Sequence, residues 1–316
     1  MLWAGIALLL AYAVAILAWL LQRRAGASSP TVAAVWCVCV LACSALVFFE
    51  QDHVVRALTF TCGSLIALRT YSYCFAAAPC GLADFLRFLS VGMLRPYLVY
   101  SPTPPLSVRA SLPWELLRMT VASGMVVITW LVARQLITVG PGRHSWLVNH
   151  LILVVGFTIV MTSFGQASLA LWRLMGLRVQ PVARQIWLAR TPADFWRRWS
   201  WPMHHWLYQY VYLPCGGRRR VALSVLAVFA VNGILHEVLA FVATGRLTGH
   251  QSAFFGISAV GVLASPMLEA VGRCGFFGEV LIRLVTLLFL AASAALMFAT
   301  IDAVTPLYAT RSWLMW

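Results

Sequence analysis

The chain has 316 residues, of which 62% are hydrophobic and 10% are charged. Soluble domains are about half apolar and about a quarter charged, so this composition excludes an ordinary water-soluble enzyme. The charge is one-sided, with 23 basic residues against 9 acidic ones, and all of the basic residues are arginine. The absence of lysine excludes Schiff-base and P-loop mechanisms, because both need a lysine amine.

Eight stretches of the chain are apolar and long enough for a membrane-spanning helix, which needs roughly 20 residues. In chain order they are Leu2–Leu21, Thr31–Phe49, Ala57–Ala78, Met119–Val139, Leu147–Ser168, Val221–Ala243, Ser252–Val271 and Phe277–Thr300. The first stretch lacks a basic leading segment and is too long for a signal peptide, so we expect it to be a retained anchor. The sequence therefore predicts an all-α polytopic membrane protein in which residues 1–316 form a single domain.

The arginines predict how these spans are oriented. If the N-terminus lies outside, 16 of the 23 arginines fall in cytoplasmic segments and 4 fall on the opposite side. Cytoplasmic loops are enriched in arginine, so we expect both termini to be extracytoplasmic, in the inner membrane of a bacterial cell. The arginines behind the net charge of +14 are then interpreted as topology signals and as contacts with membrane lipids or anionic substrates. No nucleic-acid partner is predicted.

Two of the predicted cytoplasmic segments are too long to be simple turns. The first, Pro79–Arg118, contains an amphipathic stretch over 82–89 and then the run Arg95–Pro102. The second, Arg173–Arg220, mixes arginine with tryptophan at low net hydrophobicity. Its tryptophans are Trp187, Trp196, Trp199, Trp201 and Trp206. Such a composition predicts interfacial or re-entrant helices that lie in the headgroup region.

The best-placed ionisable side chain inside a predicted span is that of His236. It follows Val221 by 15 residues, which is about 22 Å of helix and places it well inside the membrane. Asn232 lies one turn earlier on the same face, whereas Glu237 is rotated by about 100°. A neutral imidazole in a dry site is a competent general base, because burial disfavours the cation. The alternative is a histidine that only bonds to a neighbouring helix, and the spacing alone does not decide between them.

A second group of candidate residues lies between Arg190 and Trp206. Thr191 followed by Pro192 predicts the start of a short helix, with Asp194 in its first turn. That helix carries tryptophan and arginine side chains, namely Trp196, Arg197, Arg198 and Trp199. A Trp/Arg belt at the membrane interface is the alternative interpretation. The adjacent His204 and His205 have no cysteine or clustered carboxylate near them in sequence, so no metal site is predicted.

The residues of this second group resemble a known family. The run Asp194-Phe195-Trp196-Arg197-Arg198-Trp199, with its continuation from Trp206 through Tyr212 to Gly217, resembles the signature loop of the membrane-bound O-acyltransferases. Asn232 and the pair His236-Glu237 resemble the membrane-embedded histidine element of that family. Pro202-Met203-His204-His205-Trp206 and the segment 95–100 are most similar to the branch that holds diacylglycerol, sterol and wax-ester acyltransferases. The compact length is most similar to wax synthases.

The resemblance implies an acyl-CoA-dependent O-acyltransferase with no bound cofactor and with a lipid or fatty alcohol as acceptor. It implies His236 as general base, and Asn232 and Ser200 as further catalytic positions. Ser200 stands where the family usually has Asn, Asp or His, and a serine cannot act as a base near neutral pH. The expected substrate-binding residues are Trp196, Arg197, Arg198, Trp199, His204, His205, Tyr212 and Glu237. Arg218–Arg220 are further candidate contacts for CoA phosphates, or alternatively an anchor for the next span.

Other functions are kept as alternatives. The acceptor of an O-acyltransferase can also be a glycan or a secondary metabolite. An ion- or proton-coupled transporter also places ionisable groups in the membrane, but such folds usually show two matching halves, which we do not detect. A membrane scaffold without enzymatic activity is a third alternative, because of Ser200. The sequence carries no signal for an oligomeric state.

Overall fold

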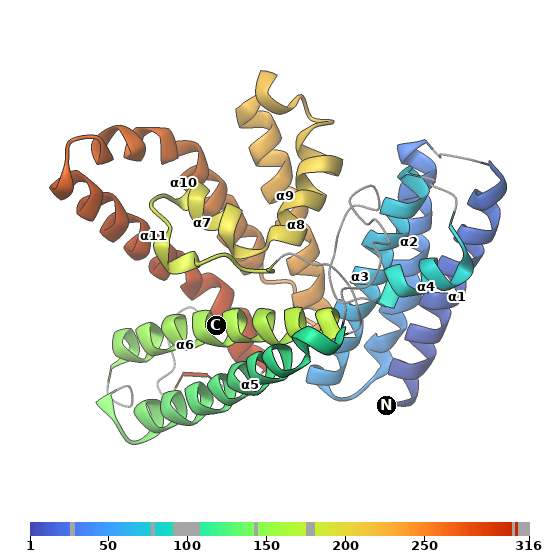
Figure 1. Ribbon diagram of the computed structural model, residues 1–316, viewed down its shortest axis with the longest axis horizontal. Helices are drawn as coiled ribbons and strands as arrows, with labels where there is room; N and C mark the ends of the chain where they lie inside the picture. The colour runs from blue at the N-terminus through green and yellow to red at the C-terminus, as the bar shows by residue number, and fades with distance from the viewer. Residues whose placement is uncertain are drawn as a thin grey trace. The chain divides into compact units, whose positions relative to one another are not determined.

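The computed structural model describes residues 1–25, 29–76, 80–90, 108–141, 145–174, 181–304 and 307–308. The regular elements in these ranges are all helical (Figure 1), and the chain forms two compact units. Unit 1 comprises Met1–Pro102 and Leu235–Thr248, and unit 2 comprises Thr103–Ile234 and Gly249–Trp316. Helix α9 (Val221–Thr244) contributes its first part to unit 2 and its last part to unit 1.

Seven helices in the described ranges are long and apolar enough to cross a membrane. They are α1 (Leu2–Ala25), α2 (Pro30–Ala45) with the 3-10 turn η1 (Leu46–Phe49), α5 (Val108–Thr138), α6 (Trp146–Leu174), α9, α10 (His250–Gly272) and α11 (Phe276–Val304). Each of them covers one of the spans expected from sequence. The prediction of an all-α polytopic membrane protein is therefore confirmed.

The remaining expected span, over 57–78, is helix α3 (His53–Ala76), which differs from the other seven in composition. Its 24 residues extend over about 36 Å, enough to cross the apolar core. Its polar side chains Thr59, Arg69, Thr70 and Ser72 are buried. Mean hydropathy averages over all faces of a helix, so it is lowered by polar side chains that face protein and not lipid. The eighth span stays a prediction.

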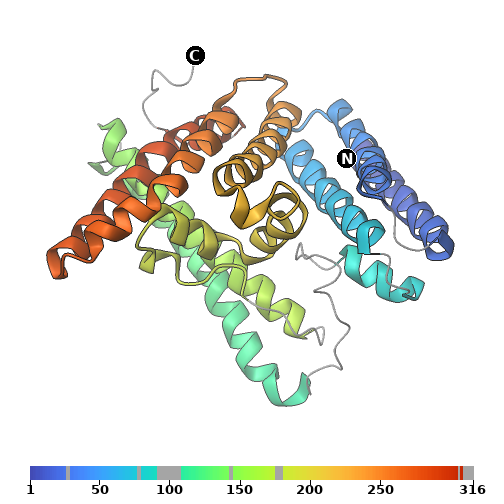
Figure 2. The same cartoon turned by 90° about the horizontal axis from the view of Figure 1, so that it is seen from above.

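The bundle of α1, α2 and α3 in unit 1 is held together at small residues. Helix α1 repeats alanine every three or four positions, and all members of this stripe are buried: Ala4, Ala7, Ala11, Ala15 and Ala18. Small side chains allow helix backbones to approach closely, which is how helices associate in a membrane. Helices α2 and α3 meet at Ser44 and Gly63, where a Cβ on the glycine would lie only 1.9 Å from the serine Oγ. Figure 2 shows these three helices, in blue, beside one another.

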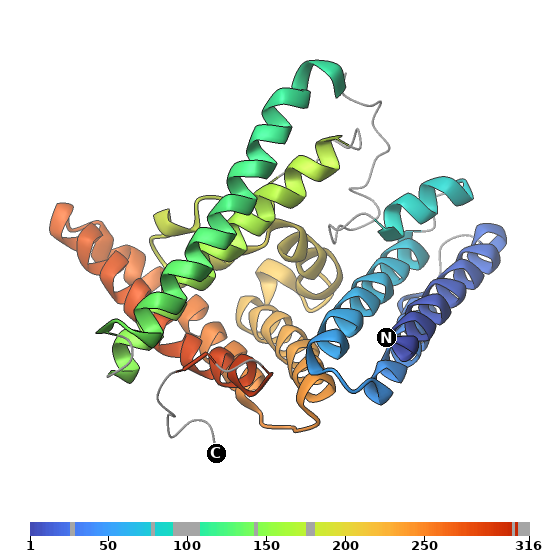
Figure 3. The ribbon, with the colours of Figure 1, turned by 90° about the horizontal axis from the view of Figure 1, so that it is seen from below.

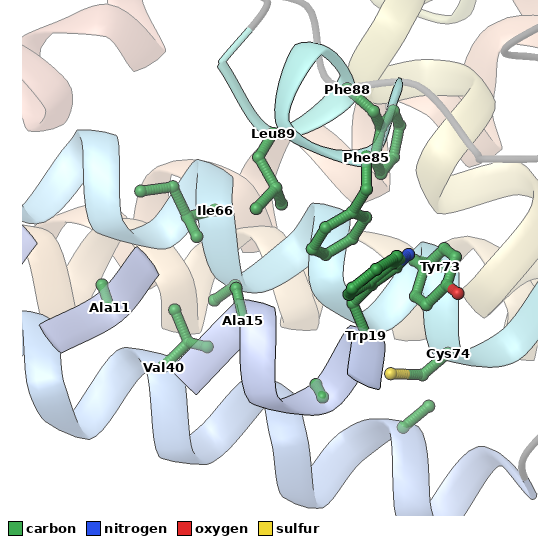
Figure 4. Close-up of a cluster of buried hydrophobic side chains, with 13 residues drawn as sticks. Ala11, Ala15, Trp19, Val40, Ile66, Tyr73, Cys74, Phe85, Phe88 and Leu89 are labelled. Atoms are coloured by element: carbon green, nitrogen blue, oxygen red, sulfur yellow. The ribbon is translucent and has the colours of Figure 1, made fainter. Parts of the chain in front are cut away.

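The amphipathic stretch expected over 82–89 is helix α4 (Leu82–Ser90), so this prediction is confirmed. Phe85, Phe88 and Leu89 are buried on its inner face. The ring of Phe85 lies 6.1 Å from that of Trp19 and 4.8 Å from that of Tyr73 (Figure 4). These contacts fix α4 to the bundle. The run Arg95–Pro102 that follows lies outside the described residues.

Unit 2 is built from two helical hairpins, α5 with α6 and α10 with α11 (Figure 3). The buried carboxylate of Glu115 on α5 links the two helices of the α5–α6 hairpin. It lies 3.2 Å from Arg173 Nη1 at the end of α6 and 3.5 Å from Arg118 Nη1 on α5. Helices α6 and α11 meet at Phe157 and Phe298, whose ring centroids are 5.4 Å apart. The two hairpins are therefore packed against each other inside this unit.

The last turns of α9 are anchored in unit 1. Val242 packs in one cluster with residues of α1, η1 and α3, and the ring of Phe241 stacks on that of Phe48 at 5.7 Å. His53 donates a hydrogen bond from Nδ1 to the Ala243 carbonyl oxygen at 2.6 Å. These contacts hold the part of the helix that carries His236.

Candidate active site

The Trp/Arg-rich segment contains two short helices, α7 (Pro192–Trp199) and α8 (Trp201–Leu207). Thr191 caps α7, because its side-chain oxygen accepts a hydrogen bond from the Asp194 amide at 3.3 Å, and Pro192 occupies the first turn. The helix start that was predicted from these residue types is confirmed. A proline at this position needs no hydrogen bond and has the backbone angle that the helix requires.

Helix α7 packs on α10 in unit 2, and Arg190, two residues before the helix, contacts α11. The Ala193 amide donates to Ser265 Oγ at 3.0 Å, and Thr286 Oγ1 donates to the Arg190 carbonyl at 2.9 Å. Arg190 also forms an ion pair with Glu279, with Nε and Oε2 3.0 Å apart. The placement of this helix in the headgroup region stays a prediction. Specific polar contacts with neighbouring helices hold it in place, and these contacts fit both an interfacial and a re-entrant helix.

Trp196 projects from α7 into an aromatic cluster. Its ring centroid lies 5.4 Å from that of Phe229 on α9, and 6.0 Å and 5.7 Å from those of Phe254 and Phe255 on α10. The indole Nε1 is buried and has no hydrogen-bond acceptor among the described residues. Buried indole N–H groups usually have a partner. This donor is therefore available to a bound group.

Trp199, at the end of α7, packs on a second set of aromatic rings. It stacks on Phe195 at 5.3 Å and on Phe157 of α6 at 6.0 Å. Phe157 is 11 residues from the start of α6, which is about 16 Å along the helix axis. Trp199 thus contacts the middle part of a spanning helix, whereas Trp196 contacts Phe254 and Phe255 near the start of α10.

The two adjacent arginines of α7 have different surroundings. The Arg198 side chain is 31% exposed, and its Nε lies 2.9 Å from Asp194 Oδ1. Its Nη1 also donates to the Arg184 carbonyl at 3.4 Å. The Arg197 side chain is 59% exposed and approaches the same carboxylate only to 3.7 Å. Arg198 therefore holds the loop in place, whereas Arg197 is the more available cation.

Ser200 connects α7 to α8. Its carbonyl accepts the His204 amide at 2.8 Å, and its hydroxyl makes no hydrogen bond to any residue that the structure describes. His205 is held by its own helix, since its Nδ1 donates to the Trp201 carbonyl at 3.0 Å. The ring of His204 stacks on that of Tyr208 at 6.4 Å. Of the two adjacent histidines, His204 thus keeps its ring nitrogens available.

The environment of His204 keeps its imidazole neutral. Burial, together with the neighbouring His205 and Arg197, lowers the pKa of His204 from 6.5 to about 4. Burial disfavours the cation because a charged ring loses its hydration, and the adjacent positive charge acts in the same direction. At neutral pH this side chain is uncharged and can therefore accept a hydrogen bond at one ring nitrogen.

Beyond α8 the chain forms one turn of π-helix, η5 (Tyr208–Tyr212), in which the Leu213 amide donates to the Tyr208 carbonyl at 3.0 Å. The rings of Tyr208 and Tyr212 stack at 5.4 Å. Gly216 and Gly217, with φ of 109° and 54°, then form a left-handed turn that only glycine adopts easily. The exposed Arg218–Arg220 follow at the 3-10 turn η6 (Gly217–Arg219), directly before α9.

Helix α9 is continuous from Val221, so Asn232 and His236 lie one turn apart on one face as expected. Asn232 is buried and His236 is half-buried. Glu237 is buried, and its Oε1 accepts the Thr248 amide at 3.2 Å, which fastens the loop after the helix. Asn232 and the predicted residues of the loop belong to unit 2, whereas His236 and Glu237 belong to unit 1.

The sequence interpretation missed a polar cluster at the start of α6. Asn149 and His150 are buried there, and the Tyr308 hydroxyl lies 2.8 Å from His150 Nδ1. The signal was the Asn-His pair at the beginning of an apolar run. As for metals, no group of three or more His, Cys, Asp or Glu side chains that could hold an ion occurs within the described ranges.

With this geometry in view, comparison with known proteins gives the family. The model of the membrane-bound O-acyltransferase family matches residues 49–258, more than half of the chain. The chain belongs to this family. The matched region includes α7, α8 and α9, so it contains both elements on which the resemblance was based.

Curated relatives of this O-acyltransferase family member match over shorter segments. Diacylglycerol O-acyltransferase 1-1 of Oryza sativa subsp. japonica is 40% identical over 55 residues, which are 16% of this chain and 10% of that protein. Diacylglycerol O-acyltransferase 1 of Arabidopsis thaliana is 32% identical over 53 residues, also 16% and 10%. "Probable long-chain-alcohol O-fatty-acyltransferase 3" of Arabidopsis thaliana is 31% identical over 140 residues, which are 39% of this chain and 40% of that protein. The matches thus span between 10% and 40% of each relative's length.

Proposed function

We propose that this protein is a membrane O-acyltransferase that moves an acyl group from acyl-CoA to the hydroxyl of a lipid or fatty alcohol. The observation that carries the proposal is the family match, together with a histidine inside an apolar helix within the matched region. The names of the relatives support an alcohol or diacylglycerol as acceptor. A wax-ester-synthase-like reaction with a fatty alcohol is our first choice.

In the proposed reaction His236 is the general base. Its neutral imidazole takes the proton of the acceptor hydroxyl while the hydroxyl oxygen attacks the thioester carbonyl carbon. The C–S bond then breaks, and the CoA thiolate leaves with the proton that His236 returns. Ester and free CoA are the products, and no acyl-enzyme is needed. Asn232, one turn away, is proposed to hydrogen-bond the thioester oxygen or to orient the imidazole.

The α7–α8 loop is proposed to bind the donor. Arg197 is the first choice for a CoA phosphate, because it is more exposed and less tightly paired than Arg198. The exposed Arg218–Arg220 are further cations of the same unit. The unpaired N–H of Trp196 and the neutral ring of His204 can contact uncharged parts of the substrate. Trp199, His205 and Tyr212 are proposed to line the donor-binding site. Glu237 holds the loop after α9 in place. Ser200 is proposed to contribute a hydrogen bond and no proton transfer.

The first test concerns His236. His236→Ala should lower acyl transfer from acyl-CoA to a fatty alcohol at least about a hundredfold, as expected for the loss of a general base. Expression and thermal stability should stay near wild type. Val238→Ala, a truncation at an exposed position two residues away on the same helix, is the matched control and should retain activity. Full activity of the His236 variant would remove the mechanism.

The second test separates the two arginines. Arg197→Gln should raise the KM for acyl-CoA with little change in thermal stability, because a charge-assisted contact with the donor is lost. Arg198→Gln should mainly lower the thermal stability and not the affinity for acyl-CoA, because it removes the contacts with Asp194 and the Arg184 carbonyl. If both variants lose protein yield equally and the KM for acyl-CoA is unchanged, Arg197 has a structural role like that of Arg198.

We also propose how the chain is organised in the cell. Residues 1–316 act as one acyltransferase domain, because the family match runs through parts of both units. The protein is a multi-pass membrane protein, and we propose the inner membrane of a bacterium with both termini extracytoplasmic. The arginine distribution supports this orientation, which places the α7–α8 loop toward the cytosol, where acyl-CoA is made.

A further inference from the structure

A cluster outside the candidate active site lies at the first turn of α6. Trp146, Asn149 and His150 are spaced three and four residues apart, so they share one side of the helix. The rings of Trp146 and His150 stack at 5.1 Å with an interplanar angle of 3°. Tyr308, beyond the end of α11, completes this stack and lies 6.0 Å from Trp146.

His150 and Tyr308 form a fixed wall of this cluster. His150 Nε2 lies 2.7 Å from the Ala291 carbonyl oxygen, which can only accept, so Nε2 carries a proton. In the neutral ring Nδ1 then accepts a hydrogen bond from the Tyr308 hydroxyl at 2.8 Å. The carboxylate of Asp302 accepts the Tyr308 amide at 2.8 Å and holds this segment in place. The hydrogen bonds of the wall are satisfied internally.

Asn149 differs from its neighbours. Its side chain is 0% exposed, and neither Oδ1 nor Nδ2 has a hydrogen-bond partner among the described residues. The Nε1 of Trp146, one turn earlier, is likewise buried without an acceptor in the described part of the chain. Buried polar side chains in native proteins are nearly always paired. An amide and an indole N–H left unpaired on one turn of a helix therefore mark the place of a bound group.

The unused hydrogen-bonding capacity defines the chemistry of that group. Asn149 offers one carbonyl acceptor and an NH₂ donor, and Trp146 offers one N–H donor. Neither side chain carries a charge, so a bound ion would lose its hydration without a compensating charge from them. A hydroxyl group has one donor and two acceptor lone pairs, which match these groups. We propose that Asn149 and Trp146 bind the hydroxyl of a neutral, long-chain alcohol from the membrane.

Aromatic rings continue from this cluster along α6. His150 contacts Phe298 at 5.8 Å, Phe298 contacts Phe157 at 5.4 Å, and Phe157 contacts Trp199 of α7 at 6.0 Å. This row of ring contacts connects the cluster with the signature loop, and we propose that the hydrocarbon chain of the alcohol lies along it. The identification of this alcohol with the acyl acceptor rests on the proposed function, whereas the subsite itself rests on the side chains of α6.

The experiment measures alcohol binding without catalysis. The full-length protein, purified in detergent and carrying His236→Ala, is titrated with radiolabelled 1-hexadecanol and, separately, with hexadecane. The alcohol should bind at least about tenfold more tightly than the alkane, as expected for the gain of hydrogen bonds. Asn149→Leu should lower alcohol affinity about tenfold, leave alkane binding unchanged and raise the Tm, because an unpaired buried amide is removed.

Two further variants complete the test. Thr162→Val on the same helix, whose hydroxyl is already bonded to the Thr158 carbonyl at 2.8 Å, is the matched control and should bind like the parent protein. Trp146→Phe should weaken alcohol binding, and it replaces the Asn149 variant if that protein fails to fold. Equal binding of alcohol and alkane, or unchanged alcohol binding in both variants, would overturn the proposal and leave a buried water as the partner of Asn149. Because no acyl-CoA is present, this outcome is independent of whether the enzyme transfers acyl groups.

Discussion

At the scale of single residues, the surroundings of His204 lower its pKa. Burial, His205 and Arg197 lower the pKa of His204 to about 4, against 6.5 for an exposed histidine. Between these values the unfolded chain binds more protons than the folded one, so folding stability falls as the pH decreases through this window. Above pH 6.5 the ring is neutral in both states, so His204 causes no loss of stability there.

This difference predicts the pH dependence of stability. His204→Gln should show a flatter decrease of Tm than wild type between pH 6.5 and about 4, because the group that takes up the proton on unfolding is gone. Above pH 7 the two proteins should respond to pH alike. The measurement is Tm by thermal unfolding in detergent at pH steps from 4 to 8. Parallel curves for both proteins over the whole range would contradict a depressed His204 pKa.

The indole N–H of Trp196 gives a second residue-scale prediction. Trp196→Phe keeps an aromatic ring among Phe229, Phe254 and Phe255 but removes the buried donor. If the N–H contacts the substrate, kcat/KM should fall about tenfold while the free energy of unfolding changes by less than about 1.5 kcal/mol. Trp172→Phe, at another buried tryptophan on α6, controls for the general effect of a smaller ring. Equal activity of both variants would make Trp196 a packing residue only.

At the scale of elements, the α5–α6 hairpin depends on one buried carboxylate. The Glu115 side chain is 6% exposed and lies within ion-pair distance of Arg118 and Arg173, which are 34% and 29% exposed. Removing one partner of a buried ion pair is costly, and partial exposure of the guanidinium groups reduces that cost. We expect Glu115→Ala to destabilise the protein by on the order of 2 kcal/mol.

Thermal unfolding of this variant checks the prediction, with Asp84→Ala as control. Asp84 belongs to an exposed pair with Arg87 at 3.5 Å, and such pairs contribute little. Its Tm should stay close to that of wild type. A Glu115 variant that unfolds at the wild-type temperature would mean that apolar packing alone holds the hairpin.

The helices themselves could be predicted from sequence because their signals are local. The lengths of the apolar stretches in the sequence predicted the spanning helices. The residue types at Thr191 and Pro192 predicted the start of α7. The position of α7 could not be predicted in the same way. Its contacts are Ser265 and Thr286, which are 72 and 96 residues away from their partners in sequence. A Trp/Arg-rich composition does not show which helices such a segment contacts.

The candidate residues could be named from the sequence motifs, and their roles stay predictions, but the contacts that distinguish these residues could not be predicted. The motifs named His236 and the arginines, yet only the distances to Asp194 separate Arg198 from Arg197. The Asn149 cluster could not be predicted, because an Asn-His pair at a helix start is common at a membrane boundary. Its unpaired amide becomes visible only when the neighbouring helices are in place.

At the scale of the whole molecule, the number of spans decides the topology. If α3 crosses the membrane with the other seven helices, the two ends of the chain lie on the same side. Tags fused to Met1 and to Trp316 should then both be accessible to protease from outside intact spheroplasts. Tags on opposite sides would mean an odd number of spans and would remove α3 from the count.

The same preparation contains an internal control for orientation. Cys274 is exposed between α10 and α11, on the side predicted to be cytoplasmic. A membrane-impermeant maleimide should label it only after the spheroplasts are opened, and Cys274→Ser identifies the labelled site. Labelling of Cys274 from outside would reverse the proposed orientation of the chain.

The widened turn at Tyr208–Tyr212 has a consequence for how this loop can tolerate deletions. A π-turn holds one residue more than an α-turn, and its wider hydrogen bonds are less favourable. Removing Gln209 would therefore let the backbone relax into an ordinary α-turn and would favour the folded state. The same deletion would place Tyr212 three positions after Tyr208 in place of four, and would disturb the stacking of Tyr208 on Tyr212, which is proposed to line the donor-binding site. A shortened chain that resists heat better but has lost its catalytic rate is the expected phenotype of this single deletion.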